Sequence, residues 1–146
     1  MDGATIAGGL HHVELWVPSL DRAEQSWGWL LGELGWTPYQ HWPAGRSWRR
    51  AGTYLVIEQS PALTAASHDR CRPGLNHLAF HAGPRTTVDR LVELAPAFGW
   101  HLLFADRHPY AGGPQVYAGY LADRDGYEVE LVAADRPDQA TQPQPG

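Results

Sequence analysis

An internal repeat constrains this chain more than any other feature, because the residues on both sides of a central segment follow the same order of patterns. Residues 10–17 and 75–81 each alternate apolar and polar side chains, which predicts a strand, and each run ends at a proline or glycine. A helical pattern follows each strand and closes on the dipeptide Gly-Trp, at Gly35 and again at Gly99. The repeat predicts two tandem copies of one module.

Each half continues with three short runs that are typical of strands. They cover residues 36–41, 47–50 and 54–58 in the first half, and residues 101–105, 116–121 and 127–132 in the second. A hairpin turn, Asp123-Arg124-Asp125-Gly126, precedes the last of them. We therefore expect an α+β fold of two tandem βαβββ modules, which form an eight-stranded incomplete barrel, or cup, with the helices outside.

The two helix starts carry side chains that are common at helix N-termini. Ser19 precedes the first helical pattern, and Thr86 or Thr87 precedes the second. The expected organisation is an N-terminal tail at residues 1–9, a first module at 10–59, a linker at 60–74, a second module at 75–134 and a disordered tail at 135–146.

Composition excludes several classes of function. The net charge is −5 and all eleven basic residues are arginines, so neither nucleic-acid binding nor Schiff-base chemistry on a lysine is expected. The single cysteine, Cys71, cannot form an intramolecular disulfide. The sequence has neither an apolar run of about 18 residues nor a secretory signal, so we expect a soluble cytoplasmic protein without membrane contact.

Strand alternation places four side chains that can bind a metal or carry a proton on the sheet face that the helix does not cover, two in each half. His12 and Glu58 take these positions in the first half, and His77 and Glu130 take them in the second. If the two halves form one curved sheet, the four side chains converge on one concavity. Two imidazoles with one or two carboxylates suit Fe, Mn, Ni, Co or Zn as a divalent ion. The alternative is a polar sheet face that simply meets water.

Further aromatic and histidine side chains are candidates for contacting a substrate. A loop rich in glycine and proline, residues 106–114, carries His108 and Tyr110 and could close over a ligand. Tyr117 could donate a hydrogen bond to a bound oxygen, and Trp48 could wall the cavity. A surface loop and ordinary core packing are the alternative interpretations.

Four segments in order resemble one known family. They are residues 10–20, 31–32, 74–80 and 123–131. Across roughly residues 10–133, the chain resembles the vicinal oxygen chelate superfamily, which includes glyoxalase I, extradiol dioxygenases, methylmalonyl-CoA epimerase and the fosfomycin- and bleomycin-resistance proteins. The resemblance implies that the metal ligands fall on His12, His77 and Glu130, with Glu58 as the fourth.

One departure from the family bears on the substrate. Trp16 stands where bacterial glyoxalase I has an arginine that holds glutathione, which favours a flat or apolar substrate. Arg124 replaces the usual proline of the last turn, a change confined to the hairpin.

Together these observations favour a homodimeric, metal-dependent, glyoxalase-like enzyme that acts on a small carbonyl or vicinal-oxygen substrate. It would be an isomerase, epimerase or lyase in which Glu58 and Glu130 move a proton. One alternative is an Fe(II) extradiol-type dioxygenase that uses three ligands only. The other is a binding protein without catalysis that sequesters a drug, as bleomycin-resistance proteins do.

Overall fold

The computed structural model describes residues 6–134, which fall into two compact units divided between His68 and Asp69. This division lies inside the segment expected to be a linker. The expected C-terminal tail, and the first five residues of the expected N-terminal tail, lie outside the described residues. No helix in the described part is long and apolar enough to cross a membrane.

The first unit contains β1 (His12–Trp16), α1 (Leu20–Glu33), β2 (Thr37–Trp42), β3 (Gly45–Arg50) and β4 (Thr53–Glu58). Its sheet has the order β1-β4-β3-β2, with β1 parallel to β4 and the other pairs antiparallel. The Ser19 hydroxyl caps α1 as predicted, because it accepts a hydrogen bond from the Arg22 backbone N–H at 3.2 Å. The helix is followed by Gly35, whose φ of 86° suits the predicted C-terminal cap.

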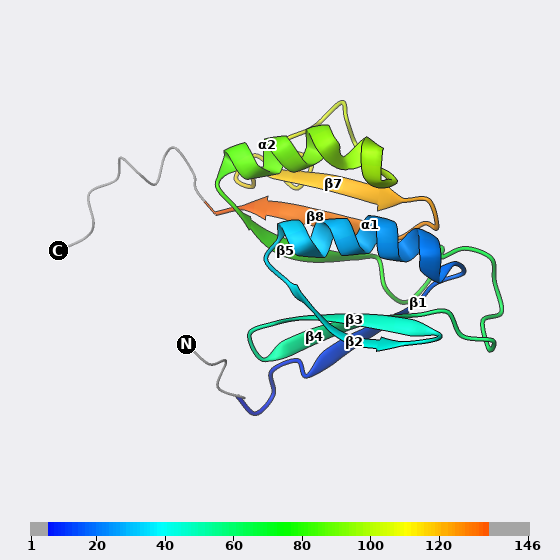
Figure 1. Cartoon of the computed structure of the whole chain (residues 1–146). Coiled ribbons are helices and arrows are strands. Elements are labelled where there is room, and N and C mark those ends of the chain that lie inside the picture. The colour runs from blue at the N-terminus through cyan, green and yellow to red at the C-terminus, as the bar shows by residue number, and fades with distance from the viewer. Residues whose placement is uncertain (1–5, 135–146) are drawn as a thin grey trace. The chain divides into compact units, whose positions relative to one another are not determined.

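The second unit repeats this order with β5 (His77–Gly83), α2 (Arg85–Leu94), the 3-10 turn η1 (Ala95–Phe98), β6 (Trp100–Leu102), β7 (Ala118–Asp123) and β8 (Glu128–Ala133). The sheet order is β5-β8-β7-β6, again with one parallel pair, and α2 covers one of its faces (Figure 1). The prediction of a threonine cap is wrong here. The helix starts directly after Pro84, which takes the cap position at φ −65° without any side-chain hydrogen bond.

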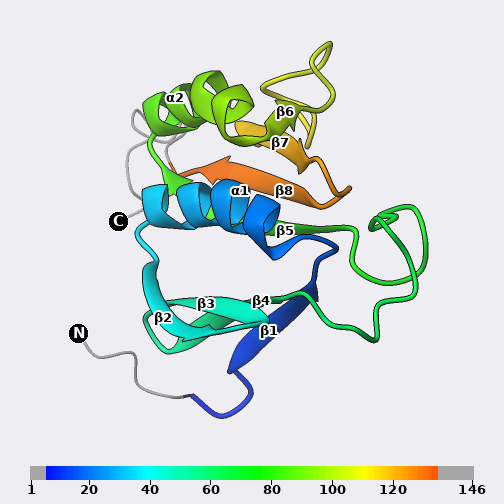
Figure 2. The same ribbon diagram turned by 45° about the vertical axis from the view of Figure 1, so that its right-hand side comes forward.

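The connection between β6 and β7 is longer than the sequence pattern predicts. Strands were expected at residues 101–105 and 116–121, but β6 ends at Leu102 and β7 starts at Ala118. Phe104 has a positive φ of 54°, which interrupts the extended backbone. Residues 103–117 therefore form one long loop (Figure 2).

Burial along the strands confirms the predicted alternation. In and after β1, Leu15 and Val17 are buried, whereas His12 and Glu14 are exposed. We call the side of each sheet opposite its helix the far face. The α+β fold and the two βαβββ modules are thus confirmed, and both sheets are open, as the predicted cup requires.

Candidate functional site

Two of the predicted residues meet on the far face of the second sheet. His77 lies at the start of β5, and Glu130 lies on the neighbouring parallel strand β8, two positions beyond the residue opposite His77. The His77 Nε2 atom is 3.2 Å from Glu130 Oε1. The His77 side chain is partly exposed, and that of Glu130 is largely covered. An imidazole and a carboxylate therefore stand side by side at a partly sheltered position.

Tyr120 on β7 supports this pair, and sequence analysis did not select it. It lies opposite Glu130 in the sheet and its hydroxyl donates a hydrogen bond to that carboxylate. Burial raises the Tyr120 pKa to about 12, and the hydrogen bond and the negative charge of Glu130 act in the same direction. The ring also meets that of His77 edge to face at 5.8 Å. A Cβ on Gly112 would lie only 2.7 Å from the Tyr120 hydroxyl, so the long loop approaches here through glycine backbone.

The opposite nitrogen of His77 has its own partners. Its Nδ1 atom lies 2.7 Å from Asn76 Oδ1 and 3.7 Å from Glu128 Oε2. The Glu128 residue is only 3% exposed, and its Oε1 atom forms an ion pair with Arg70 Nη1 at 2.6 Å. Sequence reasoning missed Glu128, although alternation places it on the same face as Glu130, directly opposite His77.

The first unit arranges its histidine differently. The His12 ring stacks on Tyr54, with centroids 4.8 Å apart and planes 5° from parallel. The His12 Nδ1 atom is 2.9 Å from His11 Nδ1, so one ring donates a hydrogen bond to the other. Glu58, at the end of β4, accepts a hydrogen bond from Trp42 Nε1 at 3.3 Å.

The register of β1 and β4 locates Glu58 relative to His12. Tyr54 stands opposite His12, as Glu128 stands opposite His77, so Val56 is the equivalent of Glu130. Glu58 lies two residues further on, which is about 6.6 Å along the strand. The position that holds a carboxylate in the second sheet is therefore apolar in the first. The carboxylate beside it belongs to Glu14, which stands opposite Val56 on β1.

A cavity of about 390 Å³ opens on the far face of the first sheet. The side chains that line it belong to His12, Glu14, Gln40, Trp42, Tyr54 and Val56. The Trp42 ring covers Gly45, where a Cβ would come within 2.2 Å of the indole. An aromatic, partly acidic surface of this size can take a small planar molecule.

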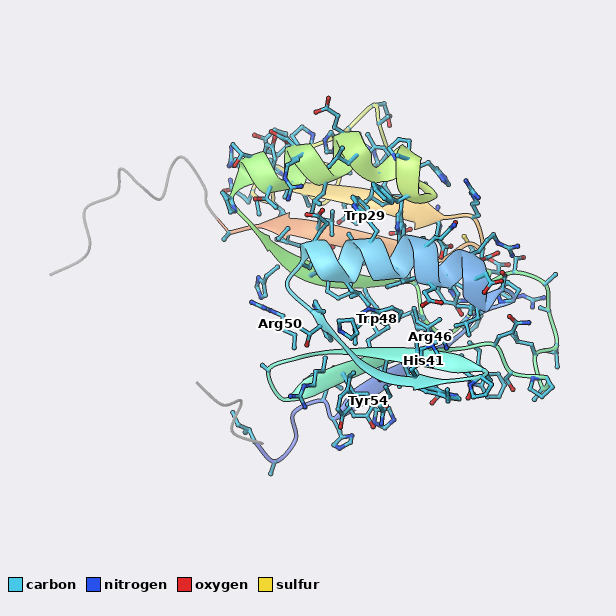
Figure 3. The ribbon with its side chains drawn as sticks, viewed as in Figure 1. Trp29, His41, Arg46, Trp48, Arg50 and Tyr54 are labelled. Atoms are coloured by element: carbon cyan, nitrogen blue, oxygen red, sulfur yellow. The ribbon has the colours of Figure 1, made fainter. Side chains whose placement is uncertain are left out.

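The predicted substrate contacts are spread over both faces. Trp16 lies on the far face, where its indole N–H donates to Glu14 Oε2 at 2.7 Å. Trp48 is buried beside α1, with Tyr54 on the other side of the sheet (Figure 3). The Tyr117 hydroxyl donates to Asp89 on α2, and this bond is the main reason that its pKa rises to about 12.

The two loop residues also lie near Tyr117 and α2. The Tyr110 ring packs edge to face on Tyr117 at 5.9 Å. The His108 Cε1 atom approaches Gly119 on its helix side, where Val88 and Val92 also lie. The structure thus brings these two residues to the helix side of the second sheet rather than to its His77–Glu130 pair.

Over the range that the structure covers, no group of three or more His, Cys, Asp or Glu side chains is arranged to hold a metal ion. His77 and Glu130 supply two possible donors. Their separation of 3.2 Å fits a shared ion, because two ligands about 2.1 Å from one metal lie roughly 3.0–3.4 Å apart at right-angled to tetrahedral spacing. The chemistry of the pair, imidazole nitrogen with carboxylate oxygen, suits the divalent ions named above.

Comparisons with known proteins agree with this fold. The Bacillus subtilis (strain 168) protein YqjT is 48% identical over 126 residues, which are 85% of this chain and 98% of YqjT. The crystal structure of a candidate glyoxalase from Bacillus halodurans is 45% identical with a TM-score of 0.81, and the match covers 86% of this chain and 96% of that one. The fosfomycin resistance protein FosX from Listeria monocytogenes, complexed with Mn(II) and sulfate, shares the fold at 22% identity, with a TM-score of 0.61 and coverage of 88% and 91%.

A family description matches residues 11–120, which include both modules up to β7. The repeated βαβββ module agrees with the fold of the solved structures that match. The chain belongs to the glyoxalase/bleomycin resistance protein/dioxygenase superfamily, which is the vicinal oxygen chelate superfamily.

Proposed function

We propose that this protein is a divalent-metal-dependent enzyme that transfers a proton on a small substrate with a carbonyl and a neighbouring oxygen. The reaction class is isomerase, epimerase or lyase. The proposed ligands are His12, His77 and Glu130. We also propose that the enzyme is a cytoplasmic homodimer that acts on a small molecule.

The observation that carries the proposal is the His77–Glu130 contact of 3.2 Å on the far face of the second sheet. Hydrogen bonds hold both side chains, because Asn76 contacts the other nitrogen of His77 and Tyr120 donates to Glu130. Metal-binding residues are typically oriented by partners of this kind. The Mn(II) in the FosX complex supports metal dependence within the same fold.

The proposal gives Glu58 a proton-transfer role without a ligand role. The fourth-ligand role implied by the family resemblance has no support in the register, because Val56 occupies the position equivalent to Glu130. The indole of Trp42 holds one Glu58 oxygen, which leaves the carboxylate oriented to accept a proton through the other. A bound divalent ion would supply Lewis acidity toward the two substrate oxygens. The Glu130 carboxylate, steadied by Tyr120, is the second proposed proton carrier.

The cavity of the first unit supports a small, planar substrate. Trp42 and Tyr54 offer aromatic surface, while Glu14 and Gln40 offer hydrogen-bonding groups. The exposed Trp16 lies on the same face and is the predicted contact that this geometry supports most directly.

Metal analysis of untagged protein tests the ligand assignment. We expect stoichiometric binding of Mn²⁺, Co²⁺ or Zn²⁺ by the wild type, loss of binding in His77→Ala, and retention in His101→Ala, which removes an exposed imidazole from the same unit. Failure of the wild type to bind any of these ions would contradict the proposal. Tight binding of an aromatic compound by such a metal-free protein would indicate a sequestering protein instead.

Two carboxylate variants separate proton transfer from ring cleavage. Exchange of the α-protons of hydroxyacetone with D₂O, catalysed by the Mn²⁺-loaded protein, should fall by about 10²–10⁴-fold in Glu58→Gln, as expected for a lost general base. Glu33→Gln, which changes an exposed carboxylate at the end of α1 and away from the cavity of the first unit, is the control. Cleavage of catechol by the Fe²⁺-loaded protein, undiminished in Glu58→Gln, would replace the proposal with a dioxygenase.

A further inference from the structure

The segment that enters β5 fixes the orientation of the Asn76 amide. The Asn76 Nδ2 group donates a hydrogen bond to the Arg70 backbone carbonyl at 3.0 Å. The Asn76 Oδ1 atom lies 2.7 Å from His77 Nδ1. A flipped amide would place an oxygen against the Arg70 carbonyl oxygen, so both contacts require the same orientation.

This orientation determines which His77 nitrogen carries the hydrogen. An amide oxygen only accepts hydrogen bonds, so Nδ1 must be the donor in the contact with Asn76. A neutral imidazole with its hydrogen on Nδ1 has a lone pair on Nε2. That lone pair points toward Glu130 Oε1, 3.2 Å away, which is itself an acceptor.

Two facing acceptors are poorly matched to each other and well matched to a cation between them. The Tyr120 hydroxyl does not relieve the mismatch, because it donates to Glu130 rather than to His77. While the His77 ring is neutral, the His77–Glu130 pair therefore has the donor pattern of a metal site and not that of a simple hydrogen bond.

Arg70 keeps the second acceptor near Nδ1 from competing with Asn76. The Glu128 carboxylate is buried, with Oε2 at 3.7 Å from Nδ1, which is beyond hydrogen-bond distance. Its other oxygen is paired with the Arg70 guanidinium at 2.6 Å, and that guanidinium also lies over the Phe104 ring. Arg70 thus anchors Asn76 through its carbonyl and Glu128 through its side chain.

We propose that Asn76, held by the Arg70 carbonyl, is a positioning residue that keeps His77 in the tautomer with hydrogen on Nδ1 and so presents Nε2 as a metal ligand. This inference rests on the proposed function for the ion, but its statement about the tautomer applies to the metal-free protein as well.

Long-range ¹H–¹⁵N correlation spectra of the metal-free protein report the His77 tautomer directly. We expect hydrogen on Nδ1 in the wild type and a shift toward hydrogen on Nε2 in Asn76→Leu, where Glu130 becomes the acceptor that remains closest. Asn76→Asp keeps an acceptor oxygen beside Nδ1 but loses the hydrogen bond to the Arg70 carbonyl, so it should retain more of the wild-type tautomer than Asn76→Leu does. Hydrogen on Nε2 in the wild type, or an unchanged tautomer in Asn76→Leu, would overturn the inference.

Calorimetric titration with Mn²⁺ and Zn²⁺ gives a second, independent readout. Asn76→Leu should bind about 10–100-fold more weakly, the usual effect of losing a partner of a metal-binding histidine, and Asn76→Asp should lose less affinity than Asn76→Leu. Gln115→Leu removes another exposed amide of the same unit and should change nothing. Asn76 is exposed, so circular dichroism melts of all three variants should match the wild type.

The two possible failures are distinguishable. If the wild type binds no metal, the proposed function fails, and the spectra still decide the tautomer. If the wild type binds metal through His77 but Asn76→Leu binds it equally well, the inference about Asn76 fails alone.

Discussion

The two modules share one topology but differ in which strand carries a carboxylate two residues beyond the level of the histidine. In the second module the carboxylate is Glu130 on the closing strand, opposite Ala79 on the opening strand. In the first module the closing strand has Val56 at that position, and the carboxylate is Glu14 on the opening strand. At this level of the sheet the repeat thus retains the histidine and the strand pairing but moves the acidic group by one strand, whereas Glu58 on the closing strand lies two residues further on.

The histidines differ in the same way. Both ring nitrogens of His77 lie within hydrogen-bond distance of polar side chains, which gives the ring a fixed orientation. His12 instead stacks on Tyr54 beside an aromatic cavity. The two copies of the module thus surround equivalent histidines differently, with a stacked tyrosine in the first and polar side chains in the second.

Truncation of a core tryptophan should produce the largest effect, and an equal one in both modules. Trp27 on α1 and Trp100 on β6 are both fully buried. We expect Trp27→Ala and Trp100→Ala each to lower the free energy of unfolding by about 3–5 kcal/mol, measured by urea denaturation. The control Trp16→Ala removes a side chain that is 39% exposed and should cost less than about 1 kcal/mol. A large difference between the two core variants would contradict the equivalence of the modules.

Alanine in place of a close-packed glycine should destabilise the first sheet more than the second. In the first sheet, a Cβ at Gly45 meets the Trp42 indole at 2.2 Å and the Ile57 carbonyl oxygen at 2.9 Å, and the backbone contact cannot move aside. We expect Gly45→Ala to cost about 1–3 kcal/mol and to shift Trp42 away from Glu58, which Trp fluorescence would report.

The matched change in the second sheet is Gly119→Ala. There the nearest atom is a Val92 methyl at 2.7 Å, a side chain that can rotate away. Its cost should be smaller, about 1 kcal/mol, by the same urea measurement. Equal costs at the two glycines would show that the indole over Gly45 yields as readily as a valine.

Removal of a helix cap should have a smaller effect on the free energy of unfolding, and it should differ between the two modules. Ser19→Ala removes the side chain that caps α1 and should lower the free energy of unfolding by about 1 kcal/mol. Thr86→Ala lies inside the first turn of α2, where no side-chain cap exists, and should change it by less than about 0.5 kcal/mol. If Thr86→Ala lowers the free energy of unfolding as much as Ser19→Ala does, Thr86 caps α2 as the sequence predicts.

Sequence patterns predicted the fold because each relevant signal is local. Alternation in residues 10–17, the serine before α1, and the Gly-Trp pairs after each helix act over a few residues, and the structure contains all of them. The proline that ends the second alternating run is Pro84, and its fixed φ also suits the residue before a helix.

The site was harder to predict because it depends on register between distant strands. The end-of-strand pattern selects Glu58. Only the pairing of β1 with β4 shows that Val56, and not Glu58, is the residue of the first sheet equivalent to Glu130. Glu128 can be predicted by alternation, because it lies two residues before Glu130 on the same strand. Tyr120 can be predicted by pairing residues across the hairpin turn at 123–126. The Arg70 contacts were not, because no periodicity relates a loop residue to a sheet.

The smallest effect should appear at alkaline pH, in the contact between Tyr117 and α2 in the second module. The hydrogen bond to Asp89, followed by burial, raises the Tyr117 pKa from 10 to about 12. A raised pKa means that the folded state holds the phenol proton more tightly than the unfolded chain does. The stabilisation is therefore complete below about pH 10 and is lost as the pH rises through about 12.

Tyr117→Phe should remove this pH dependence at the cost of one hydrogen bond. Urea unfolding at about pH 9 should show the variant less stable by about 1 kcal/mol or less, since the bond lies at a partly exposed position. As the pH approaches 12, the wild type should lose that advantage and the two curves should converge. Tyr120, whose pKa is also raised to about 12, titrates in the same range in both proteins, so the difference between them isolates Tyr117. Asp89→Asn should flatten the pH dependence in the same way, because it removes the charge that holds the proton. A constant gap between wild type and Tyr117→Phe across this range would mean that the Asp89 contact does not bind the phenol proton more tightly in the folded protein.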